Sequence, residues 1–284
     1  MRPTLEVTTV IGCPLACVYC PQKLLLSQYP ATAARELDFE GFKRILSTVP
    51  NYVRVDFSGM AEPWTARDAT LMFLHALDQG HPVAVYTTLF GMDDKDVAAL
   101  VDSIYSFTAQ NPLCLHLPDD EGRARGFRPS AEYQEHLRSV LDAMNAVVNA
   151  KGNDGGLQMM TMSSSGRLHP SIANLLPSGL GAFGAISRAG TVDEELAPRV
   201  MHEAPVICQS SPHYDHNNVL PNGDVILCCM DYGCRHILGN LLADSYESLF
   251  YSAEMRRLAR SNERPTYDDS SICKSCSNAS EIAI

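Results

Sequence analysis

The sequence predicts an α/β protein followed by a small α+β domain, and three observations carry this prediction. Strand-like and helix-like segments alternate over residues 5–150, three cysteines follow the first strand-like run, and six more cysteines lie beyond about residue 195. Alternating strands and helices form right-handed βαβ units around a parallel sheet. We therefore expect one domain over residues 1–195 and a second over residues 196–284.

The elements of the first domain follow from composition and periodicity. Strand-like runs lie at residues 5–10, 52–57, 82–86 and 113–117, with weaker ones at 157–162 and 182–187. Helical patterns lie at residues 39–48, 67–79, 93–104 and 131–149, with a weaker one at 169–176. Asp38 is placed to cap the first of these helices. Taken alone, these patterns allow either a barrel or a doubly wound sheet.

Composition and charge restrict the class of protein. A chain of 284 residues with 45% hydrophobic residues can bury a full core. No run reaches membrane-spanning length, and residues 1–12 lack the features of a signal peptide. We expect a cytoplasmic protein, in which ten cysteines serve as metal ligands rather than disulfides. The net charge of −11 argues against nucleic acid or an anionic membrane as partner, and it suits a cationic substrate such as an aminosugar.

Cys13, Cys17 and Cys20 form a tight triad in a short loop after the first strand-like run. Converging thiolates select iron–sulfur clusters, zinc or Cu(I). Structural zinc takes four protein ligands, commonly from paired C-x-x-C motifs. Three cysteines would leave one iron of a cluster without a protein ligand, which is the open position that a catalytic centre needs. Three buried or zinc-binding cysteines are the alternative.

This C-x3-C-x2-C pattern, with an aromatic residue before its last cysteine, resembles the signature of radical SAM enzymes. The resemblance implies a (β/α)6 partial TIM barrel and a [4Fe–4S] cluster held by Cys13, Cys17 and Cys20. S-adenosylmethionine (SAM) would chelate the fourth iron, with Tyr19 near its adenine. A 5′-deoxyadenosyl radical formed by one-electron cleavage of SAM would then abstract hydrogen from substrate carbon. The electron donor would be a protein such as flavodoxin or ferredoxin.

The second strand-like run ends in a turn, Phe57-Ser58-Gly59-Met60-Ala61-Glu62-Pro63, that is similar to the glycine-rich SAM-binding turn of this family. The resemblance implies that the backbone and the Glu62 carboxylate receive the methionyl ammonium of SAM, with Ser58 and Gly59 beside it. Glycine permits close approach of the backbone. Ala61 stands where relatives often have a second glycine. An ordinary strand-end turn is the alternative.

Three further SAM contacts are expected where later strands end. Thr87 ends the third strand and His116 lies at the fourth. Arg188 follows the sixth, in a segment that resembles one meeting the SAM carboxylate in relatives, and a guanidinium suits a carboxylate because it pairs bidentately. Each of the three is equally readable as a polar strand terminus.

The cysteines beyond residue 195 resemble the SPASM/Twitch extension of radical SAM enzymes. Residues 217–227 read as a hairpin around Pro221-Asn222-Gly223, and a helix is expected over residues 245–260. The resemblance implies an auxiliary [4Fe–4S] cluster held by four cysteines, Cys208, Cys228, Cys273 and Cys276. Four cysteines in two groups suit a zinc ribbon equally well, which is the rival interpretation.

Three cysteines remain. Cys114 lies in an apolar run and is expected to pack in the core. Cys229 follows a proposed ligand directly, so its side chain is expected on the opposite face of a strand. Cys234 lies in a polar segment that the resemblance to Twitch extensions places over the barrel mouth, and we expect it to be the catalytic thiol; a spare or merely buried cysteine is the alternative. Whether Cys229 or Cys234 also ligates the auxiliary cluster stays open, as does the oligomeric state.

The reaction expected from the resemblance is epimerisation of a carbon in a small polar metabolite, such as a sugar, an aminocyclitol or aminoglycoside, or a nucleoside, in antibiotic or other natural-product biosynthesis. An epimerase must return hydrogen to the opposite face, and a thiol donates it readily. The alternatives are a dehydrogenase of the same substrates, which passes a second electron to the auxiliary cluster, and an enzyme that modifies ribosomal peptides. An iron–sulfur or zinc scaffold without catalysis is the fourth, and the SAM-type turn counts against it.

Overall fold

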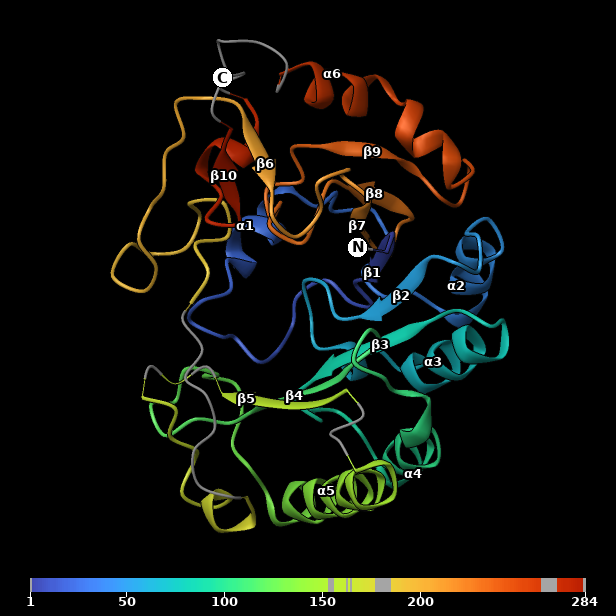
Figure 1. Ribbon diagram of the computed structural model, residues 1–284, viewed down its shortest axis with the longest axis vertical. Coiled ribbons are helices and arrows are strands. Elements are labelled where there is room, and N and C mark those ends of the chain that lie inside the picture. The colour runs from blue at the N-terminus through green and yellow to red at the C-terminus, as the bar shows by residue number, and fades with distance from the viewer. Residues whose placement is uncertain are drawn as a thin grey trace.

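The computed structural model describes residues 2–152, 156–161, 163, 165–176, 185–261 and 270–282. Its main sheet has eight strands in the spatial order β5-β4-β3-β2-β1-β7-β8-β9 (Figure 1). These strands are β1 (Thr4–Val7), β2 (Arg54–Phe57), β3 (Val83–Thr87), β4 (Leu113–Leu117), β5 (Leu157–Thr161), β7 (His216–Val219), β8 (Asp224–Ile226) and β9 (Ile237–Asn240). A separate antiparallel pair joins β6 (Val206–Cys208) to β10 (Ala279–Glu281).

The first five strands join the sheet in chain order, as the strands of a barrel do. Strands β1 to β5 are parallel, and each pairs with the next one along the chain. A doubly wound sheet reverses its strand order partway, whereas a barrel adds every strand on the same side. The fold is therefore α/β with a mostly parallel sheet, as expected. Within that sheet, β1 to β5 follow one another in chain order.

Four of the six described helices, α2 to α5, cover one face of this sheet (Figure 1). The six are α1 (Gln22–Gln28), α2 (Phe39–Leu46), α3 (Ala69–Asp78), α4 (Asp94–Asp102), α5 (Ala131–Lys151) and α6 (Ala253–Ser261). Helices α2 to α5 follow one another along the outer side of β1 to β5 (Figure 1). The expected cap at α2 is present, because Asp38 Oδ1 accepts the Gly41 N–H at 2.7 Å. The face buried against the sheet is apolar, and Phe42, Ile45 and Phe73 are inaccessible to solvent.

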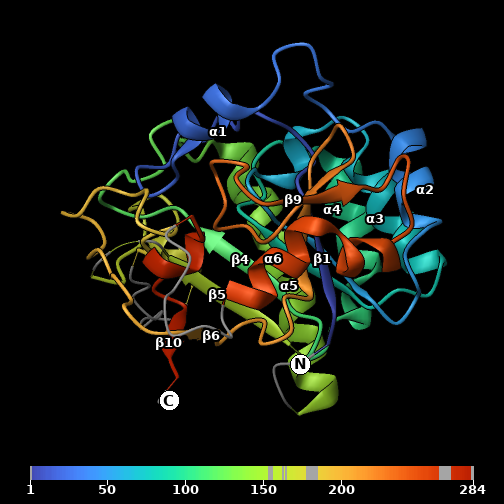
Figure 2. The ribbon, with the colours of Figure 1, turned by 90° about the horizontal axis from the view of Figure 1, so that it is seen from above.

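The carboxyl ends of the parallel strands meet on one side of the molecule. Viewed from above, the two chain ends lie at the bottom, whereas α1, which follows the cysteine loop, lies at the top (Figure 2). Strand β1 runs between these sides, so the loops after the strands gather near α1. In α/β folds, ligands bind at this end of the sheet.

Three expected elements differ from those observed. The helix expected over residues 245–260 is broken into a 3₁₀ turn, Glu247–Tyr251, and α6, because Ser252 between them is extended. The helix expected at residues 169–176 is only the 3₁₀ turn Ala173–Leu175. The sixth strand expected at residues 182–187 lies largely outside the described residues, and its described part, residues 185–187, is not in a strand.

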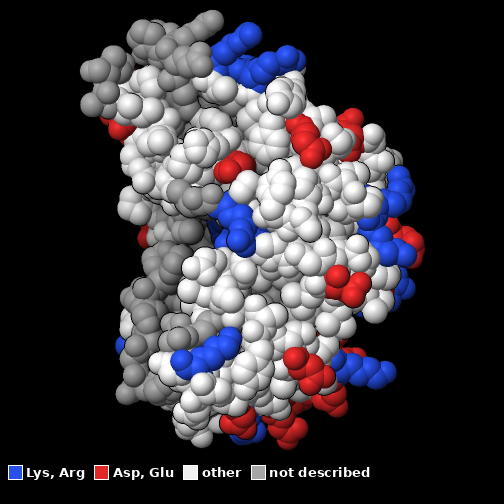
Figure 3. Space-filling view, turned by 45° about the vertical axis from the view of Figure 1, so that its right-hand side comes forward, with Lys and Arg blue, Asp and Glu red and all other residues white. Residues whose placement is uncertain are grey.

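The main sheet does not stop at residue 195, where we expected the domain boundary. Strand β7 pairs in parallel with β1, and β8 and β9 continue the sheet as antiparallel neighbours. Residues beyond 195 therefore form one edge of the sheet as well as the separate β6–β10 pair. On the face drawn in Figure 3, basic and acidic side chains of the described residues are interspersed. No helix in the described ranges is long and apolar enough to cross a membrane.

Candidate active site

The cysteine loop is held against the fourth β-to-α connection. The Val18 N–H donates to the Arg123 carbonyl at 2.9 Å, and the Gly126 N–H donates to the Leu15 carbonyl at 2.8 Å. Cys17 forms an isolated antiparallel bridge with Ala124. Residues 123–126 therefore clamp the loop from outside. Sequence reasoning missed this clamp, because a polar connection carries no local sign of the loop that it contacts.

Gly126 leaves no room for a side chain. A Cβ atom at this position would lie 1.9 Å from the Pro14 carbonyl oxygen, so either the clamp or the cysteine loop must move. We expect Gly126→Ala to lower the iron content of reconstituted protein and to slow SAM cleavage, as measured by iron analysis and 5′-deoxyadenosine release. Gly80→Ala is the control for general destabilisation, because its φ of 76° strains an alanine although a Cβ there meets nothing within 4 Å. Full iron loading in Gly126→Ala would contradict a clamping role.

The three cysteines of the loop lie close enough to influence one another. Cys13, Cys17 and Cys20 are all half-buried. Burial, together with a smaller contribution from the neighbouring cysteines, raises the pKa of the Cys13 thiol to about 11 and that of Cys17 to about 12. Binding of iron requires thiolates, so loading the triad must release protons.

The glycine turn after β2 packs directly against the cysteine loop. Gly59 has a positive φ of 74°, and a Cβ atom there would lie 2.5 Å from Thr8 Oγ1 and 2.7 Å from Asn218 Nδ2. Only glycine fits this position without displacing β1 and β7. Three residues later, the Glu62 N–H donates to Cys13 Sγ at 3.4 Å. The turn and the triad, which are separate motifs in the sequence, thus form one site.

The Glu62 carboxylate is buried and held by donors from the end of β3. Its Oε1 accepts a hydrogen bond from the Thr87 hydroxyl, and its Oε2 accepts from both the N–H and the hydroxyl of Thr88 at 2.8 Å. Burial raises the pKa of Glu62 to about 7, although these hydrogen bonds work in the opposite direction. The expected role of Thr87 is thereby revised, because its hydroxyl points at Glu62 and Thr88 lines the cavity instead.

A cavity of about 220 Å³ lies between the triad, the glycine turn and the ends of β3 and β4. Six of the expected cofactor-binding residues and the three loop cysteines line it: Tyr19, Ser58, Gly59, Glu62, His116, Arg188, Cys13, Cys17 and Cys20. Within the described structure, the buried Ser58 hydroxyl has no hydrogen-bond partner. Buried hydroxyls are normally paired, so this orphaned group facing the cavity fits a polar cofactor such as SAM.

Arg188 gives this cavity its positive charge, and His116 lies near it. The Arg188 guanidinium stacks over the Tyr232 ring at 5.8 Å and lies 3.9 Å from Cys229 Sγ. Tyr232 in turn places its hydroxyl 3.1 Å from Cys20 Sγ. Burial, reinforced by the nearby Arg188 charge, lowers the pKa of His116 to about 4, so the imidazole is neutral at pH 7. Arg188 is therefore the cavity's fixed cation and suits a ligand carboxylate.

A second cavity, of about 160 Å³, holds the four cysteines expected to bind the auxiliary cluster. Cys208 ends β6, Cys228 follows β8, Cys273 lies within the 3₁₀ turn Ile272–Ser275, and Cys276 follows that turn; all four line this cavity. Burial raises the pKa of the Cys228 thiol, and the nearby Cys273 and Cys276 raise it further. The structure thus brings together four thiols that are spread over the C-terminal part of the sequence.

The sulfur atoms of these cysteines lie farther apart than four thiolates on one zinc ion would. Four thiolates on one zinc lie about 3.8 Å apart, since each Zn–S bond is about 2.3 Å long. In the described part of the chain, the only set of three or more candidate ligand atoms within 4.8 Å of one another is Glu6, Asp56 and His216. No three cysteine sulfurs are therefore as close as zinc requires, whereas a cubane cluster holds its thiolates farther apart.

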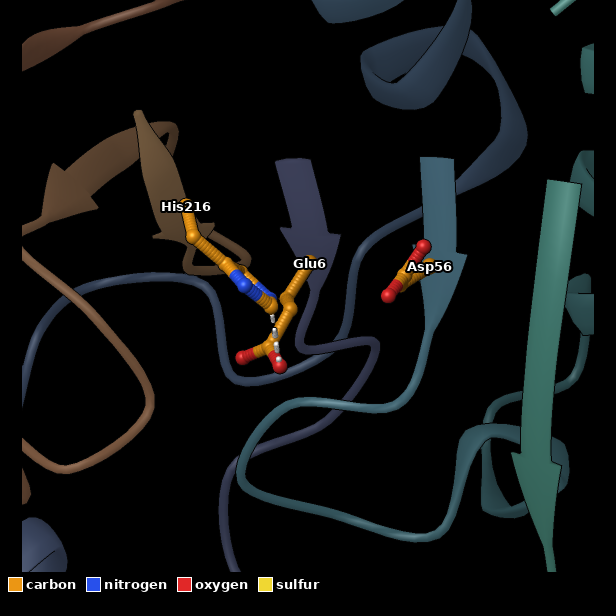
Figure 4. A group of neighbouring side chains, drawn as sticks. All are labelled: Glu6, Asp56 and His216. Carbon is orange, nitrogen blue, oxygen red and sulfur yellow. Dashed lines mark hydrogen bonds and ion pairs between the residues drawn. The ribbon is translucent and has the colours of Figure 1, made fainter. Parts of the chain in front are cut away.

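Glu6, Asp56 and His216 project from the adjacent strands β1, β2 and β7 toward one another (Figure 4). Arg54 pairs with both oxygens of Asp56, at 2.6 and 2.7 Å. His216 Nε2 lies 3.1 Å from Glu6 Oε1. The contact with His216 lowers the pKa of Glu6, and Glu6 raises that of His216. Both oxygens of Asp56 are therefore taken by Arg54, which leaves the set unsuited to a metal ion.

The SAM-side cavity and the cavity of the four auxiliary cysteines are adjacent, and Cys229 lies between them. Cys229 lines both cavities, whereas the adjacent Cys228 is turned to the cluster ligands. Cys229 also contacts Glu6, which lines the first cavity, and Glu6 pairs with His216, which lines the second. The two cysteines lie beyond the end of β8 and both line the second cavity, so the expected placement on opposite faces of a strand is not found.

The structure places Cys234 outside both cavities. It packs at the edge of a small apolar cluster that contains Ile11, Leu25 and Tyr232, and it is not among the lining residues of either cavity. The turn that was expected to bring it over the site instead hydrogen-bonds to itself, with the Cys234 N–H donating to the Asp231 carbonyl. Cys114 is fully buried on β4, as expected for a packing residue.

Comparison with known proteins agrees with this geometry. Residues 208–277 match the family model of SPASM, an iron–sulfur cluster-binding domain. No curated protein sequence is significantly similar to the chain. The structure of BtrN in complex with AdoMet and 2-DOIA aligns over 100% of this chain and 95% of that chain, with 13% identity and a TM-score of 0.60. Native anSMEcpe with bound AdoMet and Cp18Cys peptide aligns over 96% and 86%, with 14% identity and a TM-score of 0.51. Both are radical SAM enzymes with SPASM or Twitch domains, and the alignments show that this chain shares their fold.

Proposed function

We propose that this chain, which has the radical SAM fold and a SPASM iron–sulfur domain, is an enzyme that removes hydrogen from a carbon of a small polar molecule. The observation that carries the proposal is the first cavity, where the cysteine triad, the Gly59 turn and Glu62 converge. SAM and two [4Fe–4S] clusters are the cofactors, one cluster at each cysteine set. A flavodoxin or ferredoxin is the proposed electron donor.

When bound and reduced, the triad cluster and SAM supply a 5′-deoxyadenosyl radical that abstracts hydrogen from carbon. The chain's own residues bind and orient the reactants. Cys13, Cys17 and Cys20 would hold three irons and leave the fourth for SAM. Thr87 and Thr88 fix the Glu62 carboxylate in place, and this carboxylate would accept a hydrogen bond from the methionyl ammonium. The Ser58 hydroxyl and Arg188 offer a donor each to the remaining polar groups of the cofactor.

Glu62→Gln is expected to weaken SAM binding by about ten- to a hundredfold, because a hydrogen bond to a charged group contributes about 1.5–3 kcal/mol. The glutamine keeps the size of the side chain, so iron content should hardly change. Equilibrium binding of SAM to anaerobically reconstituted protein measures the effect. The exposed pair Lys43–Glu40 provides the control, Glu40→Gln. Unchanged SAM affinity in Glu62→Gln would mean that another group receives the ammonium.

Epimerisation is the first candidate for the fate of the substrate radical, and the thiol in the cavity wall supports it. A thiol can return hydrogen to the face opposite the abstraction. Because Cys229 lines the SAM-side cavity and Cys234 does not, we propose Cys229 as the donor in place of Cys234. The resulting sulfur radical would regain one electron from the flavodoxin or ferredoxin and one proton from solvent.

Dehydrogenation is the second candidate, and it is favoured by the shared wall between the two cavities. A substrate radical in the first cavity lies next to the auxiliary cysteines, which is the arrangement needed to remove a second electron. Peptide modification is the third, and its support is the likeness to anSMEcpe solved with a peptide. One assay should therefore include substrates for all three candidate reactions.

The test of the proposed function uses reduced, reconstituted protein with SAM and a panel of aminosugars, aminocyclitols, nucleosides and short peptides. We expect 5′-deoxyadenosine, formed faster with the true substrate, in a 1:1 ratio with product. Absence of SAM cleavage in protein that carries both clusters would overturn the proposal.

A further inference from the structure

Glu6 lines the SAM-side cavity but has no role in the cofactor sites described above. It lies within β1, upstream of the cysteine loop, and its side chain is only 10% exposed. Two carboxylates line this cavity. Glu62 contacts the cysteine loop and is held by threonines, whereas Glu6 contacts β7 and Cys229. The two acids therefore occupy different parts of the cavity.

The Glu6 carboxylate is fixed by its neighbours on β7. Strand register sets Glu6 opposite Asn218 and Thr4 opposite His216. His216 Nε2 lies 3.1 Å from Oε1, and Asn218 Nδ2 donates to Oε2 at 3.3 Å. A carboxylate offers about four acceptor positions. Even with the additional contact to the Cys229 thiol, acceptor capacity remains on a group that is already oriented.

The charged groups around Glu6 indicate which kind of ligand it can bind. Arg188 is the cavity's cation and stacks over Tyr232, where it can take a carboxylate or hydroxyl oxygen. Both carboxylate oxygens of Asp56 already accept hydrogen bonds from Arg54. Glu6 is therefore the acidic group of this region that is open to a ligand, and it attracts hydrogen-bond donors, above all a cationic one.

We propose that Glu6 is a substrate-binding residue that takes the protonated amino group of an amino-substituted polyol, with His216 and Asn218 as its positioning residues. The proposal deepens the function given above and rests on it. It makes the substrate an amine-bearing sugar or cyclitol rather than a neutral one. Because Cys229 touches both Glu6 and Arg188, a molecule bound to Glu6 also lies beside the wall of the auxiliary site.

Paired ligands test this proposal on the SAM-loaded holoprotein under anaerobic conditions. Calorimetry compares glucosamine with glucose, and 2-deoxystreptamine with myo-inositol, so that each pair sets an amine-bearing ring against a neutral one. We expect the amine to bind about ten- to a hundredfold more tightly in at least one pair. Glu6→Gln should remove this preference while leaving iron content and SAM affinity unchanged. His216→Ala should reduce it, and His216→Gln, which keeps a donor, should restore part of it.

The control is Glu40→Gln on the surface of α2, which should keep the preference. Equal affinity within both pairs, or no binding of any amine, would overturn the proposal. Loss of cluster loading or SAM binding in Glu6→Gln would also overturn it, because Glu6 would then serve the structure. The proposed function itself fails separately, through absence of SAM cleavage, so the two failures are distinguishable.

Discussion

Replacing Cys13, Cys17 and Cys20 together with alanine is expected to remove about half of about eight irons per chain and to abolish SAM cleavage. The triad and the C-terminal set lie in separate cavities, and each would hold one [4Fe–4S] cluster. The auxiliary ligands come from β6, the segment after β8 and the turn at Cys273, none of which belongs to the cysteine loop. The auxiliary cluster should therefore load normally in the triple variant.

The measurement is iron and acid-labile sulfide per chain, with electron paramagnetic resonance of the reduced protein and chromatography of 5′-deoxyadenosine. The matched variant replaces Cys273 and Cys276, and it should lose the other half of the iron. That variant should keep SAM binding at the triad. Zinc in place of iron at the C-terminal site would contradict the auxiliary cluster and leave the triad untouched. Residual SAM cleavage in the triple variant would contradict the assignment of the triad.

Local patterns were sufficient to predict most elements of the first domain and both cysteine sets. Alternating apolar runs gave β1 to β5 with small shifts at their ends, and Asp38 marked the start of α2 correctly. Motif spacing gave the triad, the Gly59 turn and the four auxiliary cysteines, which the structure brings together in two cavities. These features depend on residues near one another in the sequence or on a spacing that a metal cluster imposes.

Features that depend on which strands become neighbours were missed. Glu6 reads as an ordinary strand residue until β7 is placed beside β1 and supplies His216 and Asn218. The clamp at residues 123–126 depends in the same way on a loop contact between distant segments. Cys234 was favoured because of its polar sequence neighbours, yet the turn at Asp231 directs it to an apolar cluster. Polarity of a segment does not determine which cavity it faces.

Cys229→Ala is expected to decide between the two fates of the substrate radical. If Cys229 is the hydrogen donor, its thiol proton exchanges with solvent, so the unaltered enzyme in deuterated water places one deuterium on the inverted carbon. The alanine variant still cleaves SAM and abstracts hydrogen, but the substrate radical has no donor in the cavity wall. Formation of the epimer should then fall below detection, whereas 5′-deoxyadenosine should still appear. Mass spectrometry of product and 5′-deoxyadenosine measures both.

Cys234→Ala is the matched control, since Cys234 lies outside the lining of both cavities whereas Cys229 lines both. It should epimerise at the normal rate and incorporate deuterium normally. The reverse pattern, with epimerisation lost in Cys234→Ala and kept in Cys229→Ala, would restore the donor role to Cys234. A product two mass units lighter than substrate and free of deuterium, formed by the unaltered enzyme, would make dehydrogenation the reaction. In that case Cys229→Ala should leave hydrogen abstraction intact, because a dehydrogenase returns no hydrogen to the substrate. The second electron would instead pass from the first cavity toward the auxiliary cysteines.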